Sequence, residues 1–249
     1  MLRYGLIILC FCLLPISAWS FSGEGCGSGK CSDCHSLTAK EARNILPPGA
    51  DKIVSVKFSE VGGLWEVKGQ AQGRMFTVYV DYSKRYMIAG KVLRLRDGVD
   101  MTRSVDIKQL KRDGAFLIGN EAAAVKVFVF TDVKCSHCRR LHKELFKVVE
   151  QNPEIAFYVK LMAFMTDKKK VDDIVCSGSV EVLNAAMTDK PVAELDGDCP
   201  AVDETMAFAK RWNIRSTPTL VLPDGKLLSG GRSASALLEA LQPYMPAAK

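Results

Sequence analysis

The sequence lacks any concentrated run of basic residues. Its net charge is +6 over 249 residues, and its 34 lysines and arginines are scattered among 28 acidic residues. A chain that binds nucleic acid usually carries a basic stripe or cluster, so we expect no nucleic acid among its partners. No internal repeat is visible either. At this length one large domain or two small ones are expected, with ample core.

The apolar stretch at the start of the chain is too short for a lasting membrane span. Residues 1–20 read MLRYGLIILCFCLLPISAWS, with Arg3 as a positive region, an apolar region over Leu6–Leu14, and the small residues of Ala18-Trp19-Ser20 near a cleavage point. This pattern is typical of a secretory signal peptide, and an N-terminal anchor helix is the alternative. We expect an exported chain whose mature form begins near Phe21.

Nine cysteines are present, and two of them fall in the expected signal peptide. Export places the other seven where disulfides form and persist. An odd number means that at least one thiol stays free, pairs between chains or holds another group. The seven are Cys26, Cys31, Cys34, Cys135, Cys138, Cys176 and Cys199.

The first half of the mature chain predicts a small α+β domain. Residues 21–36 form a Gly- and Cys-rich leader that cannot bury a core of its own. Over residues 37–98, a capping box at Thr38–Glu41 predicts a short helix that Pro47-Pro48 ends. Four segments with alternating apolar and polar residues then predict an antiparallel sheet: VSVKFSE, LWEVKGQ, MFTVYVD and RYMIAGKVLRL. Residues 99–119 are interpreted as a helical linker.

Residues 120–249 follow a different pattern. AAVKVFVFTD is a nearly continuous apolar run, typical of a strand buried on both faces, and RRLHKELFKVVEQ has helical spacing. A second buried strand, IAFYVKLMAF, precedes a charged helical segment, the strand TLVLPDG and a last helix over Ser233–Leu241. This order of strands and helices predicts an α/β layer architecture.

The sequence Cys135-Ser136-His137-Cys138 lies between the buried strand and the helix. The first thiol then lies at a helix N-terminus, which favours negative charge and lowers the pKa of a cysteine below its free value of about 8.5. We expect Cys135 to be an exposed attacking thiolate and Cys138 the resolving thiol. His137 would add positive charge and favour the dithiol form. Half of a zinc site or a structural disulfide are the alternatives, but zinc needs two more ligands, so no metal is predicted.

Three stretches together resemble the periplasmic protein-disulfide isomerases of the DsbC/DsbG type. They are FTDVKCSHCRRLHKEL, RSTPTLVLPDGKLLSGG and the pair of Cys176 and Cys199, and the resemblance runs from about Leu37 to Tyr244. It implies a thioredoxin-like domain with a helical insertion, preceded by a dimerisation domain over residues 37–98. It also implies that Pro218 is cis and that Thr217 and Pro218 shape the groove where a client's backbone docks; an ordinary trans proline is the alternative.

The same resemblance implies a structural disulfide between Cys176 and Cys199. Closing a loop of this size would stabilise the fold by about 3 kcal/mol in the chain-entropy model. A second redox-active pair is the alternative reading. The resemblance further implies a homodimer and a membrane thiol reductant of the DsbD type, which would keep the Cys135/Cys138 site reduced.

The leader contains a second Cys-x-x-Cys sequence, Cys31-Ser32-Asp33-Cys34, and His35 follows it. This spacing is that of c-type haem attachment, with two thiols on the porphyrin and the histidine on iron. Haem needs an apolar pocket, however, and the sequence has only three histidines, of which His137 and His142 belong to the thioredoxin-like region. A disulfide among Cys26, Cys31 and Cys34 is the favoured reading, and haem, a metal site or an auxiliary redox centre remain open.

The sequence therefore predicts a homodimeric periplasmic thiol:disulfide isomerase and reductase that acts on misoxidised exported proteins and carries no cofactor. A net dithiol oxidase is the nearest alternative within the same chemistry. An electron-transfer protein with haem at Cys31, Cys34 and His35 belongs to a second class. A chaperone whose cysteine pair is incidental belongs to a third.

Overall fold

The computed structural model describes residues 34–195 and 199–246. The expected signal peptide, Cys26 and Cys31 lie outside the described residues. Within them, no helix is long and apolar enough to cross a membrane.

The small N-terminal sheet begins after a helix that starts where the capping box predicts. In α1 (Ala39–Ile45) the Thr38 side chain accepts from the Glu41 backbone N–H, and the Glu41 carboxylate accepts from the Thr38 N–H at 2.9 Å. The sheet that follows is antiparallel in the order β1-β2-β3-β4. Its strands are β1 (Lys52–Phe58), β2 (Leu64–Ala71), β3 (Arg74–Asp81) and β4 (Met87–Ile88).

One face of this sheet is buried under α1, because the alternating pattern places apolar side chains on one side. Trp65, Val67 and Val80 are buried there with Leu37 and Ala42. The fourth predicted strand is largely wrong. RYMIAGKVLRL was expected to be a full strand, but only Met87–Ile88 pairs with β3. Gly90 interrupts the segment, and apolar side chains of residues 86–95 are exposed.

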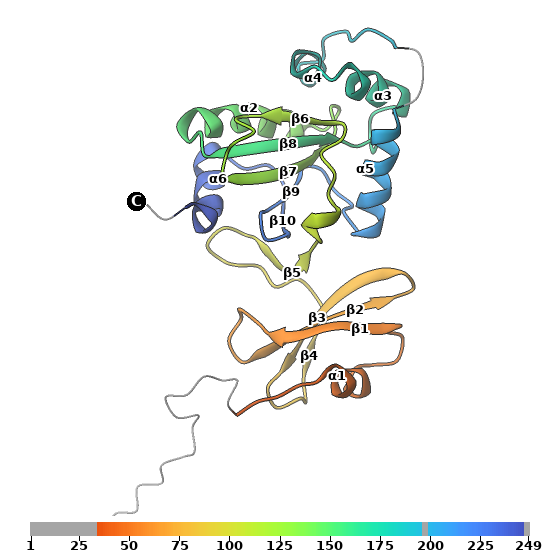
Figure 1. Cartoon of the computed structure of the whole chain (residues 1–249), viewed down its shortest axis with the longest axis vertical. Helices are drawn as coiled ribbons and strands as arrows, with labels where there is room; N and C mark the ends of the chain where they lie inside the picture. The colour runs from red at the N-terminus through yellow and green to blue at the C-terminus, as the bar shows by residue number, and fades with distance from the viewer. Residues whose placement is uncertain (1–33, 196–198, 247–249) are drawn as a thin grey trace, which may run out of the picture. The chain divides into compact units, whose positions relative to one another are not determined.

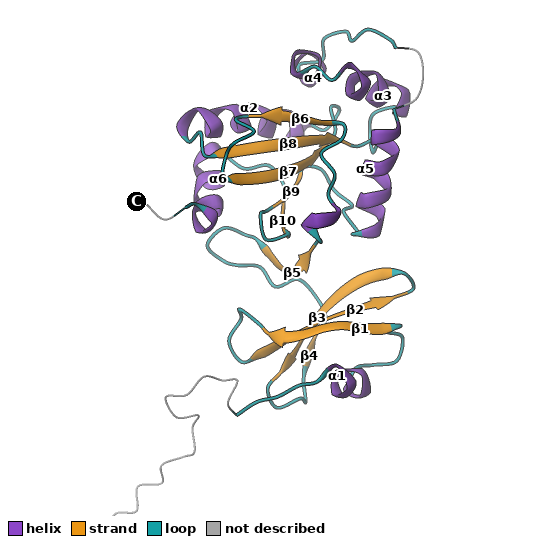
Figure 2. Cartoon of the chain, in the orientation of Figure 1, coloured by secondary structure: helices purple, strands orange, loops and turns teal. Residues whose placement is uncertain are grey.

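The second sheet has six strands in the order β5-β10-β9-β7-β8-β6 (Figures 1 and 2). The central strands β7 (Val125–Thr131) and β8 (Ile155–Leu161) are parallel, and the other neighbours are antiparallel. The outer strands are β5 (Asp100–Ser104), β6 (Ala115–Ile118), β9 (Thr219–Val221) and β10 (Lys226–Ser229). Gly225, in the turn between β9 and β10, has φ +83° and lies so close to Val105 that a Cβ would meet the Val105 carbonyl oxygen.

The helical linker predicted for residues 99–119 is wrong. This segment contributes β5 and β6, the two edge strands of the six-stranded sheet, with the short 3₁₀ helix η2 (Ile107–Gln109) between them. The thioredoxin-like sheet therefore begins at Asp100 and not at residue 120.

Five α-helices complete this part of the described chain. They are α2 (Ser136–Gln151), α3 (Lys168–Ser177), α4 (Val180–Met187), α5 (Pro200–Arg211) and α6 (Ala234–Leu241), and the 3₁₀ helix η3 (Gln242–Tyr244) follows α6. Helices α3 and α4 form the predicted helical insertion between β8 and α5. The predicted mixed α/β architecture is confirmed.

Strand β7 is buried on both faces, as its apolar run predicts. Val127 and Val129 pack in one cluster with Leu141 of α2 and Leu237 of α6. Phe130 points to the opposite side and packs with Ala209 of α5, and its ring stacks on Phe208 at 5.8 Å between centroids. Because both faces of β7 are fixed, the residues directly after it have a defined position.

Candidate functional site

The site forms where β7 ends and α2 begins. Cys135 is the N-cap residue of α2, with extended backbone angles of φ −76° and ψ 117°. Its backbone N–H donates to the Asp132 carbonyl oxygen at 3.1 Å, and its carbonyl oxygen accepts from the Arg139 N–H at 3.1 Å. The strand thus delivers Cys135 to the helix N-terminus, as predicted.

Cys135 is less accessible than expected. Only 7% of the residue is exposed, because the segment before β9 lies against it. The Cys135 Sγ donates to the Thr217 carbonyl oxygen at 3.5 Å, and the Thr217–Pro218 peptide bond is cis. The predicted cis proline beside the cysteine pair is therefore confirmed, and the prediction of a freely exposed attacking thiol is wrong.

The pKa of Cys135 is lower than that of an ordinary thiol. Burial alone would raise it, but hydrogen bonds from the Cys138 thiol, the Cys138 backbone N–H and Thr217 outweigh burial, and the His137 N–H adds to them. In the thiol form Sγ makes no capping hydrogen bond to the first turn, so these N–H groups remain available to the thiolate. Unsatisfied first-turn N–H groups are the physical reason that a helix start stabilises an anion.

Cys138 has the opposite behaviour. It lies one turn into α2 and is almost fully buried. Burial, together with its hydrogen bond to the Cys135 sulfur, raises the pKa of Cys138 to about 11, although Thr131 and the Asp132 backbone N–H lower it in part. The two thiols are thus distinguished by their pKa values. Cys135 ionises more readily than an ordinary thiol, and Cys138 ionises less readily.

The polar and charged side chains around the Cys135–Cys138 motif make hydrogen bonds and ion pairs with residues other than the two cysteines. The His137 side chain is exposed and its Nδ1 accepts a hydrogen bond from the Arg140 guanidinium at 2.9 Å. Arg139 donates to the Val133 carbonyl oxygen and pairs with Asp189. The backbone N–H of His137 lowers the pKa of Cys135, and the effect of its ring charge stays a prediction.

A residue that the sequence interpretation missed, Asp132, organises the surroundings of Cys135. This carboxylate is fully buried. Its Oδ2 accepts from the backbone N–H groups of Phe164, Met165 and Thr166 at 3.1, 2.7 and 3.1 Å. Its Oδ1 accepts from the Lys134 N–H at 2.8 Å and from the Thr166 hydroxyl at 2.5 Å.

The pKa of Asp132 is low for a buried acid. Burial would raise it, but the hydrogen bonds from Thr166, Met165 and Lys134 outweigh that effect. The signal available in the sequence was an Asp that directly follows a buried strand, where an acidic side chain needs donors close by.

The sequence interpretation also missed Thr131, the residue before Asp132. Its side chain hydrogen-bonds the Cys138 sulfur.

Cys176 and Cys199 lie next to each other. Cys176 is the penultimate residue of α3 and Cys199 is the N-cap of α5. Both are thiols in this structure, and burial together with the hydrogen bond to Cys176 raises the pKa of Cys199 to about 11. The resemblance placed these two residues together correctly, and the disulfide between them stays a prediction.

The leader motif is only partly described. Cys34 is exposed and His35 is half-buried, while Cys31 lies outside the described residues. In the described ranges no three His, Cys, Asp or Glu side chains are grouped as a metal site would require. Haem attachment at Cys31, Cys34 and His35, or a disulfide among Cys26, Cys31 and Cys34, stays a prediction.

Comparisons with known proteins agree with this geometry. A family model described as a thioredoxin-like domain matches residues 118–244. A probable thiol:disulfide interchange protein DsbC of Bordetella avium (strain 197N) is 26% identical over 190 residues, which cover 72% of this chain and 65% of that protein. The chain thus spans slightly less than two thirds of the length of this curated relative.

Two solved structures are similar at lower identity. A disulfide interchange protein from Neisseria gonorrhoeae is 24% identical, with 54% of this chain and 98% of that chain covered and a TM-score of 0.46. The catalytic domain of Proteus mirabilis ScsC is 18% identical, with 53% and 89% covered and a TM-score of 0.47.

The predicted resemblance to the DsbC type is confirmed by the curated relative. The family match covers just over half of the chain and contains Cys135, Cys138 and the cis Pro218. From this match and from the sheet order around β7, the chain belongs to the thioredoxin-like family.

Proposed function

We propose that this chain is a thiol:disulfide interchange protein that isomerises or reduces wrong disulfides in exported proteins. The observation that carries the proposal is the asymmetry of the two thiols. The pKa of Cys135 is lowered at the start of α2, whereas that of Cys138 is raised behind it. The thiolate is the attacking form in disulfide exchange, so this arrangement makes Cys135 the nucleophile.

The first step forms a mixed disulfide. The Cys135 thiolate attacks one sulfur of a client disulfide, and a bond forms between Cys135 Sγ and that sulfur. The client's S–S bond breaks, and its second sulfur leaves as a thiolate that takes a proton from water. In this proposal the Thr217 carbonyl oxygen, 3.5 Å from Cys135 Sγ, accepts a backbone N–H of the client beside the reacting sulfur.

The mixed disulfide has two outcomes. If another client thiolate attacks the sulfur of the client that is bound to Cys135, a new client disulfide forms and the Cys135 thiolate is released, with no net oxidation. If the Cys138 thiolate attacks Cys135 Sγ instead, the client leaves with two thiols and the Cys135–Cys138 disulfide forms. This second outcome reduces the client by two electrons, and a thiol reductant must then restore the protein.

Burial of Cys138 favours isomerisation over reduction. The larger cause of its raised pKa is burial, and the smaller is the hydrogen bond to the Cys135 sulfur. Formation of the mixed disulfide removes the negative charge of Cys135 but leaves Cys138 buried. A buried resolving thiol ionises less readily than an exposed one, so in this proposal the attack of Cys138 on Cys135 Sγ is slowed relative to that of a client thiol.

The partners and the compartment belong to the same proposal. The Bordetella avium relative is named a DsbC protein, and a periplasmic location with a membrane reductant of the DsbD type fits a site that must be kept reduced. We also propose a homodimer through the N-terminal sheet. In the described part of the chain no further strand covers the outer edge of β4, and Tyr86, Met87 and Ile88, in β4 or directly before it, are exposed.

The test is the refolding of a scrambled multi-disulfide protein, compared with oxidation of its reduced form. An isomerase accelerates the first reaction at catalytic amounts and needs Cys135 for it. A protein that accelerates only the second is a net oxidase. If Cys135→Ser retains the activity, neither reading holds and a chaperone with an incidental cysteine pair is indicated.

A further inference from the structure

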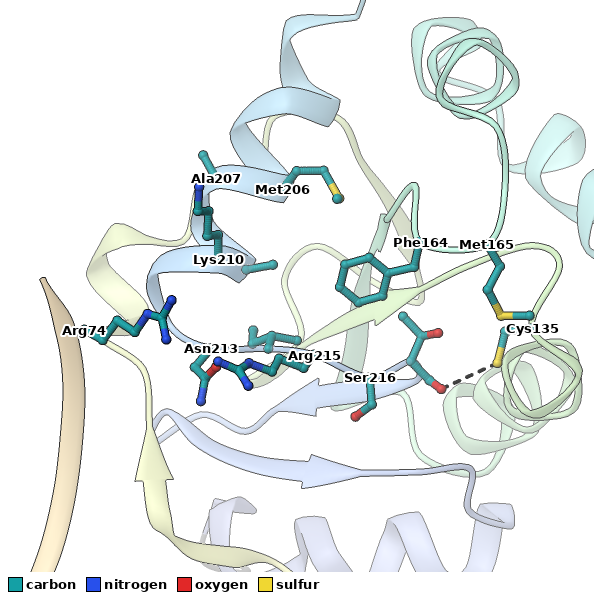
Figure 3. A pocket seen from close by; sticks show the side chains of 13 residues that line it. Arg74, Cys135, Phe164, Met165, Met206, Ala207, Lys210, Asn213, Arg215 and Ser216 are labelled. Atoms are coloured by element: carbon teal, nitrogen blue, oxygen red, sulfur yellow. Dashed lines mark hydrogen bonds between the residues drawn. The ribbon is translucent and has the colours of Figure 1, made fainter. Parts of the chain in front are cut away.

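A groove opens beside Cys135, between α5, the loop after β8 and the segment before Pro218 (Figure 3). Its volume is about 770 Å³, which is in the range of sites that hold several side chains of a ligand. Cys135 and Thr217 lie at one end of the lining. A polypeptide that reacts at Cys135 can therefore extend into the groove.

One wall of the groove is apolar and exposed. Phe164 and Met165, from the loop after β8, are 42% and 59% exposed, although both side chains are large. Met206 of α5 and Ile214 continue the apolar lining. Grouped apolar side chains that remain accessible mark a surface that contacts another molecule.

This wall has a fixed backbone. The N–H groups of Phe164 and Met165 both donate to the buried carboxylate of Asp132, and Asp132 also accepts the Cys135 N–H at its carbonyl oxygen. The apolar wall and the nucleophile are therefore held by one residue. A preformed wall loses little entropy when a ligand docks.

The lining also carries positive charge. Its three cations are Arg74 of β3, Lys210 at the end of α5 and Arg215 in the segment before Pro218, and all three are exposed (Figure 3). None of them makes an ion pair in the ranges that the structure describes, and no described carboxylate lines the groove. Three cations without a counter-charge beside an apolar wall are complementary to a ligand that is apolar and acidic.

We propose that this groove selects client segments that carry a bulky apolar residue and an acidic residue close to the cysteine of the disulfide. The apolar residue packs against Phe164 and Met165, and the carboxylate lies near Lys210 and Arg215. The inference rests on the proposed thiol:disulfide interchange function and adds the class of client segment that the Cys135 site takes first. The covalent step is unchanged, with a bond from Cys135 Sγ to the client sulfur and the release of the second client sulfur as a thiolate.

The test uses three short peptides of equal length, each with one cysteine in a disulfide with 2-mercaptoethanol and one leucine at a fixed distance from it. The residues beside the leucine are two glutamates, two glutamines or two lysines. Second-order rate constants for reaction with the reduced full chain are measured at low and high ionic strength. We expect the glutamate peptide to react on the order of tenfold faster than the lysine peptide at low salt, because two exposed charges each contribute modestly. Salt should shrink this ratio.

Variants of the groove then show which side chains cause the preference for the glutamate peptide. Lys210→Glu combined with Arg215→Glu should invert the ratio of glutamate to lysine peptide, and Arg74→Gln, Lys210→Gln and Arg215→Gln together should bring it close to one. Using the ratio within each variant cancels any change in the intrinsic reactivity of Cys135. Lys108→Glu is the matched control, since Lys108 is an exposed lysine outside the groove lining, and its ratio should equal that of the unmodified chain.

A separate measurement tests whether the client's apolar residue contacts the apolar wall. Replacing the leucine of the glutamate peptide by glycine should slow the reaction about fivefold, and Met165→Ser should remove most of that difference. Equal rates for the three peptides, or a ratio that the charge variants leave unchanged, would overturn the inference. Reaction with uncharged hydroxyethyl disulfide separates a failure of this inference from a failure of the proposed function. If that small disulfide reacts at Cys135 but the peptides are not distinguished, only the inference fails, and if nothing reacts at Cys135 the proposed function fails with it.

Discussion

The carboxylate of Asp132 accepts the backbone N–H of Met165 at 2.7 Å, and this contact joins two parts of the site that are distant in sequence. Asp132 directly follows β7, whereas Met165 lies in the loop after β8. The bond ties the loop that faces the groove to the strand that delivers Cys135. A buried carboxylate that is fully supplied with donors stabilises such a connection, and an incomplete set of donors would destabilise it.

Asp132→Asn should lower the free energy of unfolding by about 3 kcal/mol at pH 7, because breaking a buried, hydrogen-bonded charge network has costs of that order. The amide has one acceptor oxygen where the carboxylate has two, so its NH₂ group would face backbone donors. Denaturant titration of the full chain measures the difference. Asp203→Asn, at an exposed aspartate of α5, is the control and should stay within about 0.5 kcal/mol.

The effect of Asp132 should also depend on pH. The pKa of Asp132 is lowered in the folded chain, so its stabilisation is fully present above the unfolded value of about 3.9 and is lost as pH falls through the lower folded value. The stability difference between the unmodified chain and Asp132→Asn should therefore shrink in acid. A difference that stays constant from pH 7 to pH 3 would contradict the hydrogen-bonded carboxylate.

Alkylation of the reduced chain should proceed in two separate steps as pH rises. Cys135 should react with iodoacetamide at pH values below those of an ordinary thiol, and Cys138 should react only as pH approaches about 11. Mass spectrometry of the labelled peptides against pH follows both. Simultaneous labelling of the two cysteines would remove the basis for assigning one nucleophile.

A pair of variants isolates the thiol–thiol hydrogen bond. Cys138→Ala removes the donor that stabilises the Cys135 thiolate, so the pKa of Cys135 should rise toward its usual value. Cys138→Ser keeps an O–H donor at the same place and should raise it less. Thiolate absorbance against pH gives both values, and an identical pKa in the two variants would show that the backbone N–H groups act alone.

Apolar side chains near β4 should mediate self-association. Tyr86 is 69% exposed, so Tyr86→Glu does not disturb the monomer's core, and combined with Ile88→Glu it should convert a dimer into a monomer by analytical ultracentrifugation. Phe146→Glu is a matched control at an exposed apolar residue of α2. If the control dissociates the protein and the double variant does not, the interface lies elsewhere.

Cys31→Ser combined with Cys34→Ser should leave refolding of a scrambled protein largely intact, whereas Cys135→Ser should abolish it. Cys135 has a buried strand before it and the 16-residue helix α2 after it, but Cys34 precedes only the seven-residue α1. A visible spectrum of protein made in a host with c-type maturation should show no Soret band. Such a band, absent from the double variant, would establish haem attachment.

The sequence predicts most of the site because the relevant contacts are local. A strand that is buried on both faces, followed by a helix, places Cys135 at a helix start whatever the rest of the fold does. Its burial was not predictable in the same way. The residue that covers it, Thr217, lies far along the chain, and its approach depends on how β9 pairs with β7.

The edge strands were missed for a related reason. β5 and β6 are only five and four residues long, which is too short for a period of two to be distinguished from helical spacing. Their conformation is determined by their partners, since β6 pairs with β8 and β5 with β10. Strand preference is largely a matter of such packing and not of local sequence.

The pairing of β5 with β10 also constrains the order in which the sheet can be completed. β5 is made first among the six strands, and β10 is made last. During synthesis from the N-terminus, β5 must therefore wait, with unpaired backbone groups, until almost the whole chain has emerged. An unpaired strand edge readily joins another chain. A chain that ends before Lys226 would thus lose the partner of its earliest strand as well as its last hairpin, and we expect it to aggregate instead of forming a smaller folded domain.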